Sequence, residues 1–314
     1  MIQTITSSAS SGNLRLWWRI IRPKTLFASI CPVIAAGLLL FENKDVEYIG
    51  VATVIVFIVT LLSALSLQVL SNLINDYYDF KKGSDKKGRV GFKRALAEGL
   101  VTPLQMKKAI YITLGVAVLT GALLVVVGGL PIVLIGISAI VFAWLYTATS
   151  HSLSYLGIAD VFCFLYYGVF AVLGAKYLVD CTMMTDTSWL WHNTASVNKS
   201  TLCVGAICGM ISMMVLMINN LRDIEDDKAV NKKTIPVRFG KKFGESLLLM
   251  YSIFVLSLSF YAFGLSFTNL LFIPFFVIYQ KITVAQGDTY NQLLFKSGQL
   301  NLLFVLLLAL EILI

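Results

Sequence analysis

Residues 51–79 read VATVIVFIVTLLSALSLQVLSNLINDYYD, an apolar run that ends in a cluster of amides and carboxylates. The apolar part is long enough to cross the hydrocarbon core of a bilayer as a helix, which takes about 20 residues. It lacks the alternation of apolar and polar residues that marks a strand of a membrane barrel. This stretch therefore predicts a membrane-spanning helix with polar side chains at one end.

The rest of the chain has the same character. Of its 314 residues, 58% are hydrophobic and 13% are charged, and the mean hydropathy is +0.81. Soluble domains carry about 25% charged residues. We therefore expect an all-α multi-pass membrane protein with nine transmembrane helices. The nine candidate spans begin near Leu26, Val51, Leu104, Pro131, Gly157, Leu202, Leu247, Thr268 and Leu300.

The basic residues predict the orientation of these spans. The formal net charge is +8, and all Lys and Arg except Lys44, Lys176 and Lys199 fall at one side of the predicted membrane. The positive-inside rule then places the N-terminus in the cytoplasm and the C-terminus outside, and a bacterial inner membrane is the expected location. The partners expected from this composition are the lipid bilayer and an anionic substrate; nucleic acid is not expected.

We expect two parts along the chain. Residues 1–24 are predicted to form a cytoplasmic tail and a helix in the membrane interface, because Trp17 and Trp18 stand there between Arg15 and Arg19. Residues 25–314 are predicted to form a single transmembrane domain.

The polar motif at the end of the first quoted stretch has helical spacing. Asn72, Asn75, Asp76 and Asp79 stand at positions i, i+3, i+4 and i+7, so a helix presents them on one face. A second motif reads NNLRDIEDD over residues 219–227. In it, Asn219, Asp223 and Asp227 are spaced by four residues, again on one face, and the motif lies four predicted spans later, on the same side of the membrane.

Two such motifs predict a metal-dependent site for a diphosphate. Ionisable residues at the membrane edge of a span are costly and usually functional, and facing carboxylates repel each other unless a cation lies between them. Oxygen ligands from Asp and Asn suit Mg²⁺, which also takes phosphate oxygens. The alternative is that the motifs are ordinary helix ends solvated in the headgroup region, but that alternative does not explain why both have the same pattern on the same side.

The two motifs resemble the signature motifs of the UbiA-type intramembrane prenyltransferases, and Arg22-Pro23-Lys24 resembles that family's entry segment. Within the family, the run from Asn72 to Pro103 is similar to the dihydroxynaphthoate polyprenyltransferases of menaquinone synthesis. The hydroxybenzoate branch usually has an Asp where this chain has Gly83. The Lys that many members carry after Tyr146 is absent here.

The resemblance implies helices around a central cavity, and an Mg²⁺-dependent transfer of a polyprenyl group from polyprenyl diphosphate to 1,4-dihydroxy-2-naphthoate, with decarboxylation to a demethylmenaquinone. Two alternatives remain at this point: another aromatic acceptor such as 4-hydroxybenzoate, and a secondary transporter with acidic ion sites.

The resemblance also implies roles for particular residues. The metal ligands would be Asn72, Asp76, Asp79, Asn219, Asp223 and Asp227. The carboxylates Asp76, Asp79, Asp223 and Asp227 together with Tyr146 would form the catalytic centre. Diphosphate would bind to Lys82, Arg89, Arg94, Arg222 and Lys232, although each of these could instead be a surface charge that sets topology. The acceptor would bind near Arg22, Asn75 and Asp160, and Tyr146 would face the acceptor or shield a cation unless it only packs in the core.

Overall fold

The computed structural model describes residues 11–42, 49–83, 94–149, 152–183 and 197–314, which contain helices, turns and connecting segments but no β-strand. In chain order the elements are α1 (Ser11–Ile21), η1 (Pro23–Thr25), α2 (Phe27–Leu38), η2 (Leu39–Phe41), α3 (Val51–Lys81), α4 (Pro103–Thr147), α5 (Leu153–Leu156), α6 (Ala159–Phe164), the π-helical turn η3 (Leu165–Val169), α7 (Phe170–Cys181), α8 (Lys199–Arg222), α9 (Ile224–Ala229), α10 (Ile235–Phe239), α11 (Lys241–Phe263), η4 (Phe267–Leu271), α12 (Phe272–Ile282) and α13 (Thr289–Leu313).

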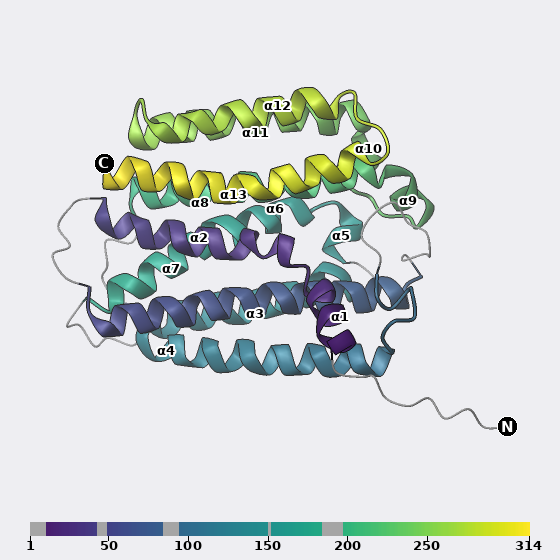
Figure 1. Ribbon diagram of the computed structural model, residues 1–314, viewed down its shortest axis with the longest axis horizontal. Helices are drawn as coiled ribbons and strands as arrows, with labels where there is room; N and C mark the ends of the chain where they lie inside the picture. The colour runs from purple at the N-terminus through teal and green to yellow at the C-terminus, as the bar shows by residue number, and fades with distance from the viewer. Residues whose placement is uncertain (1–10, 43–48, 84–93, 150–151, 184–196) are drawn as a thin grey trace.

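The long helices lie side by side in one bundle (Figure 1). The short helices α5, α9 and α10 gather at one end of the bundle, and the C-terminus lies at the other end. The helix α1 lies near the end that carries α5 and is bent by 54° from α2. Both polar motifs belong to the end that carries the short helices, because α3 and α8 finish there.

Among the described residues, 6 helices are long and apolar enough to cross a membrane, and the bent pair Leu14–Thr25 and Phe27–Phe41 would make a seventh. The predicted count of nine spans is not confirmed. One reason is that the segment Phe267–Ile282, where the eighth span was expected, is a shorter apolar helix.

The second reason is that α4, which contains the two predicted spans that begin near Leu104 and Pro131, counts as one helix. It has 45 residues and leaves the helical conformation at Gly129 (φ 62°, ψ −148°). Its beginning and its end both lie beside the end of α3. Met106 is buried in a cluster with Leu73, and the hydroxyl of Thr147 donates a hydrogen bond of 2.9 Å to Asn75 Oδ1. A straight helix of this length would extend about 68 Å, so α4 is a hairpin of two antiparallel arms that reverses at Gly129.

Local sequence explains where α4 begins. Thr102 Oγ1 accepts a hydrogen bond from the backbone N–H of Gln105 at 3.2 Å, and the Gln105 side chain accepts one from the backbone N–H of Thr102 at 2.8 Å. Pro103 occupies the first helical position. This reciprocal pair satisfies backbone donors that would otherwise be unpaired at the start of the helix.

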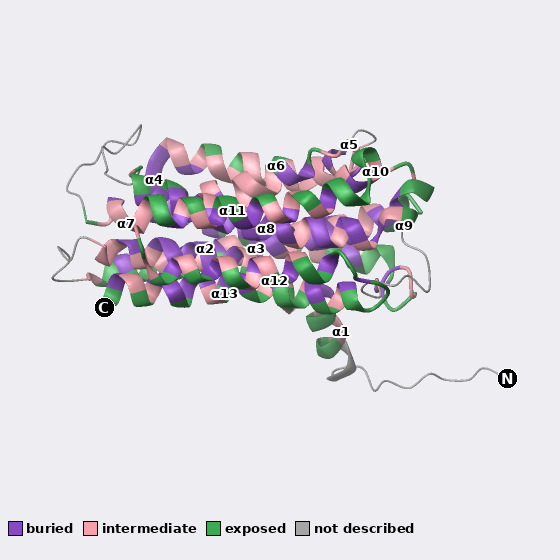
Figure 2. Ribbon diagram, turned by 90° about the horizontal axis from the view of Figure 1, so that it is seen from above, coloured by how far each residue is buried: buried purple, intermediate pink, exposed green. Residues whose placement is uncertain are grey.

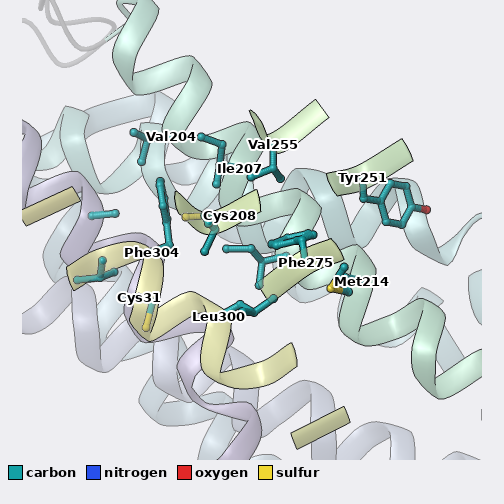
Figure 3. Packing of buried hydrophobic residues seen from close by; sticks show 14 of the residues in the cluster. Cys31, Val204, Ile207, Cys208, Met214, Tyr251, Val255, Phe275, Leu300 and Phe304 are labelled. Carbon is teal, nitrogen blue, oxygen red and sulfur yellow. The ribbon is translucent and has the colours of Figure 1, made fainter. Parts of the chain in front are cut away.

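The most deeply buried span is α8, and the core packs around it. Ile207, Cys208 and Met214 of α8 contact a cluster that includes Phe275 of α12 and Phe304 of α13, all at 0% exposure (Figure 3). The outer face of the bundle, by contrast, carries many exposed residues (Figure 2), and large apolar ones such as Leu119, Val126 and Leu134 are among them. An apolar exterior around a packed interior is the arrangement that a lipid environment favours.

Close backbone contact fixes η3 against α8. A Cβ atom on Gly168 would lie 2.4 Å from the carbonyl oxygen of Gly205, and one on Gly209 would lie 2.7 Å from the carbonyl oxygen of Phe164. Small residues at such a crossing let two membrane helices approach closely. The crossing holds α6 and η3, which form one wall of the site described below.

Candidate active site

The first polar motif occupies the last turns of α3 and faces the interior. Asn72, Asp76 and Asp79 are buried, each no more than 8% exposed. The side-chain amide of Asn72 donates to the carbonyl oxygen of Ile21 and to the hydroxyl of Thr25, both at 3.2 Å. These bonds tie α3 to the segment between α1 and α2.

Arginines from two distant segments meet at this motif. Asp76 forms ion pairs with Arg22 and with Arg94. Arg22 stands at a positive φ of 58° at the bend before η1, a conformation uncommon for residues other than Gly. Arg94 Nη2 also lies 3.8 Å from Asp79 Oδ2. The other oxygen, Asp79 Oδ1, is buried and has no hydrogen-bond partner among the described residues.

The second motif crosses a helix break instead of lying on one continuous helix. The chain leaves α8 at Arg222, and Asp223 has φ −98° and ψ 14° before α9 begins. Asp227 returns to the same side because its backbone N–H donates to the carbonyl oxygen of Asp223 at 2.8 Å. Both carboxylates are buried, at 3% and 4% exposure. The predicted clustering is therefore present, but a turn produces it in place of a single helical face.

Arg222 is held in a fixed orientation within this motif. Its Nε and Nη2 donate to the two carboxylate oxygens of Asp223 at 2.7 and 2.8 Å, and Nη2 also donates to Asn219 Oδ1 at 2.6 Å. Nη1 donates to Asn291 at the start of α13. Lys232 Nζ lies 3.7 Å from Asp227 Oδ1. Each acidic motif thus has cationic side chains beside it.

Both motifs line one small polar cavity of about 60 Å³. This polar cavity has contributions from α3, α4, α6, α8, α9 and the segments around α5 and α10. Its lining residues are Asn75, Asp79, Arg94, Tyr146, Ser154, Gly157, Ala159, Asp160, Leu216, Asn219, Asn220, Asp223, Asp227, Lys232 and Thr234.

A much larger apolar cavity of about 1060 Å³ adjoins the polar cavity. Four residues, Asn75, Tyr146, Leu216 and Asn219, line both cavities. From there the apolar cavity extends between α2, α3, both arms of α4, α7 and α13, and its lining is mostly aliphatic and aromatic. Arg22 and Asn72 line it near the polar motifs. The arrangement suits a ligand with a charged head and a long apolar tail.

Some predicted residues take a different place. The ammonium of Lys82 donates to the carbonyl oxygens of Thr147 at 2.6 Å and Thr149 at 2.7 Å and lies 4.5 Å from the ring centroid of Tyr155. Burial lowers the pKa of Lys82; nearby Asp79 opposes that shift and Lys232 reinforces it. Lys82 is not among the residues that line either cavity. Arg89 falls outside the described residues.

Sequence reasoning missed several polar residues of the polar cavity. Ser154, Asn220 and Thr234 line it, as does Gly157, whose φ is 73°. Asn291 was missed as the fourth partner of Arg222. The turn signal of Gly157 was visible in the sequence, but nothing local indicated that α5 and the segment before α10 meet at the motifs.

The residues present fit a magnesium ion that is bound partly by protein carboxylates and partly by the oxygens of a diphosphate. Among the described residues, no three His, Cys, Asp or Glu side chains are close enough to hold a metal ion by themselves. Mg²⁺ is typically held by one or two carboxylates and completes its shell with phosphate oxygens and water. Asp79 Oδ1, buried and unpaired within the described chain, is an oxygen that such an ion would satisfy.

A helical membrane bundle with a charged pocket that opens into a long apolar cavity is the structure expected of an enzyme acting on a lipid with an anionic head. The profile of the UbiA prenyltransferase family matches residues 27–292. The chain belongs to this family and is a multi-pass membrane prenyltransferase.

Individual relatives support the same assignment. The chain is 28% identical to a 1,4-dihydroxy-2-naphthoate octaprenyltransferase of Haemophilus influenzae, over 96% of this chain and 97% of the relative. It is 31% identical to the protein of the same name from Escherichia coli, over 73% and 70% of the two chains. A solved UbiA homolog from Archaeoglobus fulgidus bound to GPP and Mg²⁺ has the same fold, with a TM-score of 0.64 at 16% identity over 95% of this chain and 99% of that chain.

Proposed function

We propose that this protein transfers a polyprenyl group from polyprenyl diphosphate to 1,4-dihydroxy-2-naphthoate, with loss of CO₂, to give a demethylmenaquinol, the reduced form of a demethylmenaquinone. The observation that carries the proposal is the junction of the two cavities, where Asn75, Tyr146, Leu216 and Asn219 join a charged pocket to a long apolar one. The named function of the relatives from Haemophilus influenzae and Escherichia coli supports naphthoate as the acceptor.

The polar cavity would bind the diphosphate head. Arg94 and Lys232 line it, and Arg222 lies directly behind Asp223. These cations would neutralise the charge that develops on diphosphate as the bond to the prenyl carbon breaks, and such electrostatic stabilisation commonly contributes more to catalysis than any other effect. Mg²⁺, held with the diphosphate by Asn72, Asp76, Asp79, Asn219, Asp223 and Asp227, would supply further charge stabilisation to the leaving group.

The junction would be where the carbon–carbon bond forms. The carbon–oxygen bond of the donor breaks with both electrons going to diphosphate, which leaves an allylic cation. The electron-rich acceptor ring attacks that cation, and the carboxylate leaves the ring as CO₂ while its bonding electrons restore aromaticity. Tyr146 is placed at the junction, where an aromatic face would stabilise the cation.

Purified protein in lipid tests this function directly. With a polyprenyl diphosphate and Mg²⁺, we expect prenylation of 1,4-dihydroxy-2-naphthoate, a product mass that has lost CO₂, and loss of turnover in EDTA. Presenting 4-hydroxybenzoate in competition tests the acceptor. Preference for 4-hydroxybenzoate would contradict the proposed acceptor while leaving the family unchanged, and diphosphate-independent transport of a solute would favour the transporter alternative.

We also propose that the end of the bundle with the polar motifs faces the cytoplasm of a bacterial inner membrane. The charge bias along the sequence supports it. Fusing a reporter that is fluorescent only in the cytoplasm after Ile314 should give no signal, and the same reporter before Met1 should give a strong one. The reverse pattern would contradict this orientation.

A further inference from the structure

Beyond the two acidic motifs, the polar cavity contains three side-chain oxygens that lack partners among the described residues. Ser154 Oγ, Asp160 Oδ1 and Thr234 Oγ1 are each buried without a hydrogen bond to any residue that the structure describes. All three residues line the polar cavity. Asp160 and Thr234 are only 3% and 6% exposed. Buried polar atoms without partners are costly, so a group that binds in this part of the cavity is expected.

The segments that carry Ser154 and Thr234 contact each other. The backbone N–H of Lys233 donates to the carbonyl oxygen of Tyr155 at 3.0 Å, which joins the segment before α10 to α5. Gly157 packs directly on the same segment, against the backbone of Lys233. The ring of Tyr155 lies under two cations, with Lys82 Nζ at 4.5 Å and Lys232 Nζ at 5.4 Å from its centroid. The backbone segments that carry Ser154 and Thr234 are therefore held together.

The chemistry of these oxygens restricts the ligand. A carboxylate can only accept hydrogen bonds, and a diphosphate offers none to it. The two cations that line the cavity already contact other carboxylates, because Arg94 pairs with Asp76 and Asp79 while Lys232 lies beside Asp227. A hydroxyl group, by contrast, donates one hydrogen bond and accepts others. A phenolic hydroxyl could donate to Asp160 and accept from the hydroxyls of Ser154 and Thr234.

We propose that Asp160, together with Ser154 and Thr234, binds a ring hydroxyl of the aromatic acceptor and so selects hydroxylated naphthoates; this rests on the proposed function. The acceptor would then lie between this hydroxyl site and the junction at Asn75 and Tyr146, which both cavities share. Asp160 is a specificity-determining residue under this proposal, and the diphosphate binds beside Arg94 and Lys232.

The test compares two enzymes with three acceptors. Wild type and Asp160→Asn are assayed with 1,4-dihydroxy-2-naphthoate and with the two monohydroxy analogues that lack either the 1- or the 4-hydroxyl. A site that binds a substrate hydroxyl discriminates strongly against the analogue without it. For each enzyme we take the ratio of kcat/KM for 1,4-dihydroxy-2-naphthoate to kcat/KM for an analogue. For one of the two analogues, we expect this ratio to be about 10-fold or more larger in wild type than in Asp160→Asn.

Comparing ratios removes the intrinsic reactivity of each ring, because that reactivity is the same for both enzymes. KM for polyprenyl diphosphate and the Mg²⁺ concentration for half-maximal rate should not change in Asp160→Asn. Glu225→Gln, which alters a side chain that is 85% exposed, should behave like wild type with every acceptor. Thermal unfolding of the purified variants checks that each remains folded, so that a change in kcat/KM does not come from misfolding.

Three results would overturn the inference. If each analogue lowers kcat/KM by the same factor in Asp160→Asn as in wild type, Asp160 binds no hydroxyl of the acceptor. A raised Mg²⁺ requirement in Asp160→Asn would show that Asp160 serves the metal. Failure of wild type to prenylate 1,4-dihydroxy-2-naphthoate at all would refute the proposed function itself, and this outcome is separate because it appears before any variant is compared.

Discussion

Arg222 and Asn291 are joined by a hydrogen bond of 3.0 Å between Nη1 and Oδ1, although 69 positions separate them in the chain. The bond connects the end of α8 with the start of α13. Since the other guanidinium nitrogens bind Asp223 and Asn219, Arg222 holds three elements of the site in one orientation. A planar guanidinium can do this, whereas a lysine ammonium cannot reproduce its geometry.

We therefore expect Arg222→Lys to impair binding of the diphosphate. Loss of charge-assisted hydrogen bonds of this kind costs about 1.5–3 kcal/mol, so KM for polyprenyl diphosphate should rise by roughly 10- to 100-fold. Steady-state kinetics with the donor varied measures this. Lys228→Met removes a cation whose side chain is 52% exposed and should change KM little. An unchanged KM in Arg222→Lys would show that Arg222 has no part in holding the donor site.

A methyl group at Gly157 should disturb the polar cavity. Its φ is 73°, and a Cβ atom there would lie 2.1 Å from the carbonyl oxygen of Lys233. Gly99 has the same φ of 73° but no atom within 4 Å of the added Cβ, so Gly99→Ala is a matched control for backbone strain alone. Strain in the left-handed region costs about 1–2 kcal/mol in each variant. Gly157→Ala should lower the thermal midpoint and the turnover clearly more than Gly99→Ala, and equal effects would mean that the close contact is unimportant.

Lys82 should act mainly through structure. Its ammonium binds the carbonyl oxygens at the end of α4, which lack helical partners there. Lys82→Met should therefore lower the thermal midpoint, while KM for polyprenyl diphosphate changes less than about threefold, under 0.7 kcal/mol. The neighbouring exposed residue provides the control Lys81→Met, which should leave both quantities near wild type. A large rise in KM without loss of stability would instead support the prediction that Lys82 binds diphosphate.

The apolar cavity should limit the length of the prenyl chain. Gly121 lines it, and a Cβ atom at this position meets nothing within 4 Å, so Gly121→Phe places a ring into open space. The ratio of kcat/KM for a short donor over a long donor should rise by about 10-fold, because the pocket no longer accommodates the longer chain. Gly115→Phe on the same arm of α4 is the control, since Gly115 is exposed and does not line the cavity. Equal donor ratios in both variants would contradict a role for this cavity in holding the tail.

The sequence predicted the polar motifs better than it predicted their surroundings. Helical spacing was sufficient to place Asn72 and Asp79 together on α3, because both lie within one helix. The same argument predicted that Asp223 and Asp227 lie close together on one helical face. The two residues do lie close together, but the helix breaks at Asp223, so they do not share the face of one continuous helix. Beside this break Arg222 contacts Asn291 of α13, and no local pattern encodes a contact between residues so far apart in the chain.

The parts that could not be predicted all depend on distant contacts. Arg22 reaches Asp76 only because the chain bends at a positive φ before η1. Thr234 reaches the polar cavity because its segment hydrogen-bonds to α5. The reversal of α4 falls two residues before Pro131, so the boundary between two spans was visible in the sequence. The predicted number of spans is not confirmed, because Phe267–Ile282, where the eighth span was expected, is a shorter apolar helix, and hydropathy does not distinguish such a helix from a full crossing.

The most direct test of the central claim is naphthoate-dependent prenyl transfer in wild type, Asp76→Asn and Asp227→Asn, measured as product by mass spectrometry over a range of Mg²⁺ concentrations. The two variants change one carboxylate in each motif. If both motifs serve one site, each variant should lose activity by about 100-fold or more, as expected when a group that stabilises the leaving charge is removed, and the double variant should lose little beyond that. Full activity in either variant, or losses that multiply in the double variant, would contradict a single shared site.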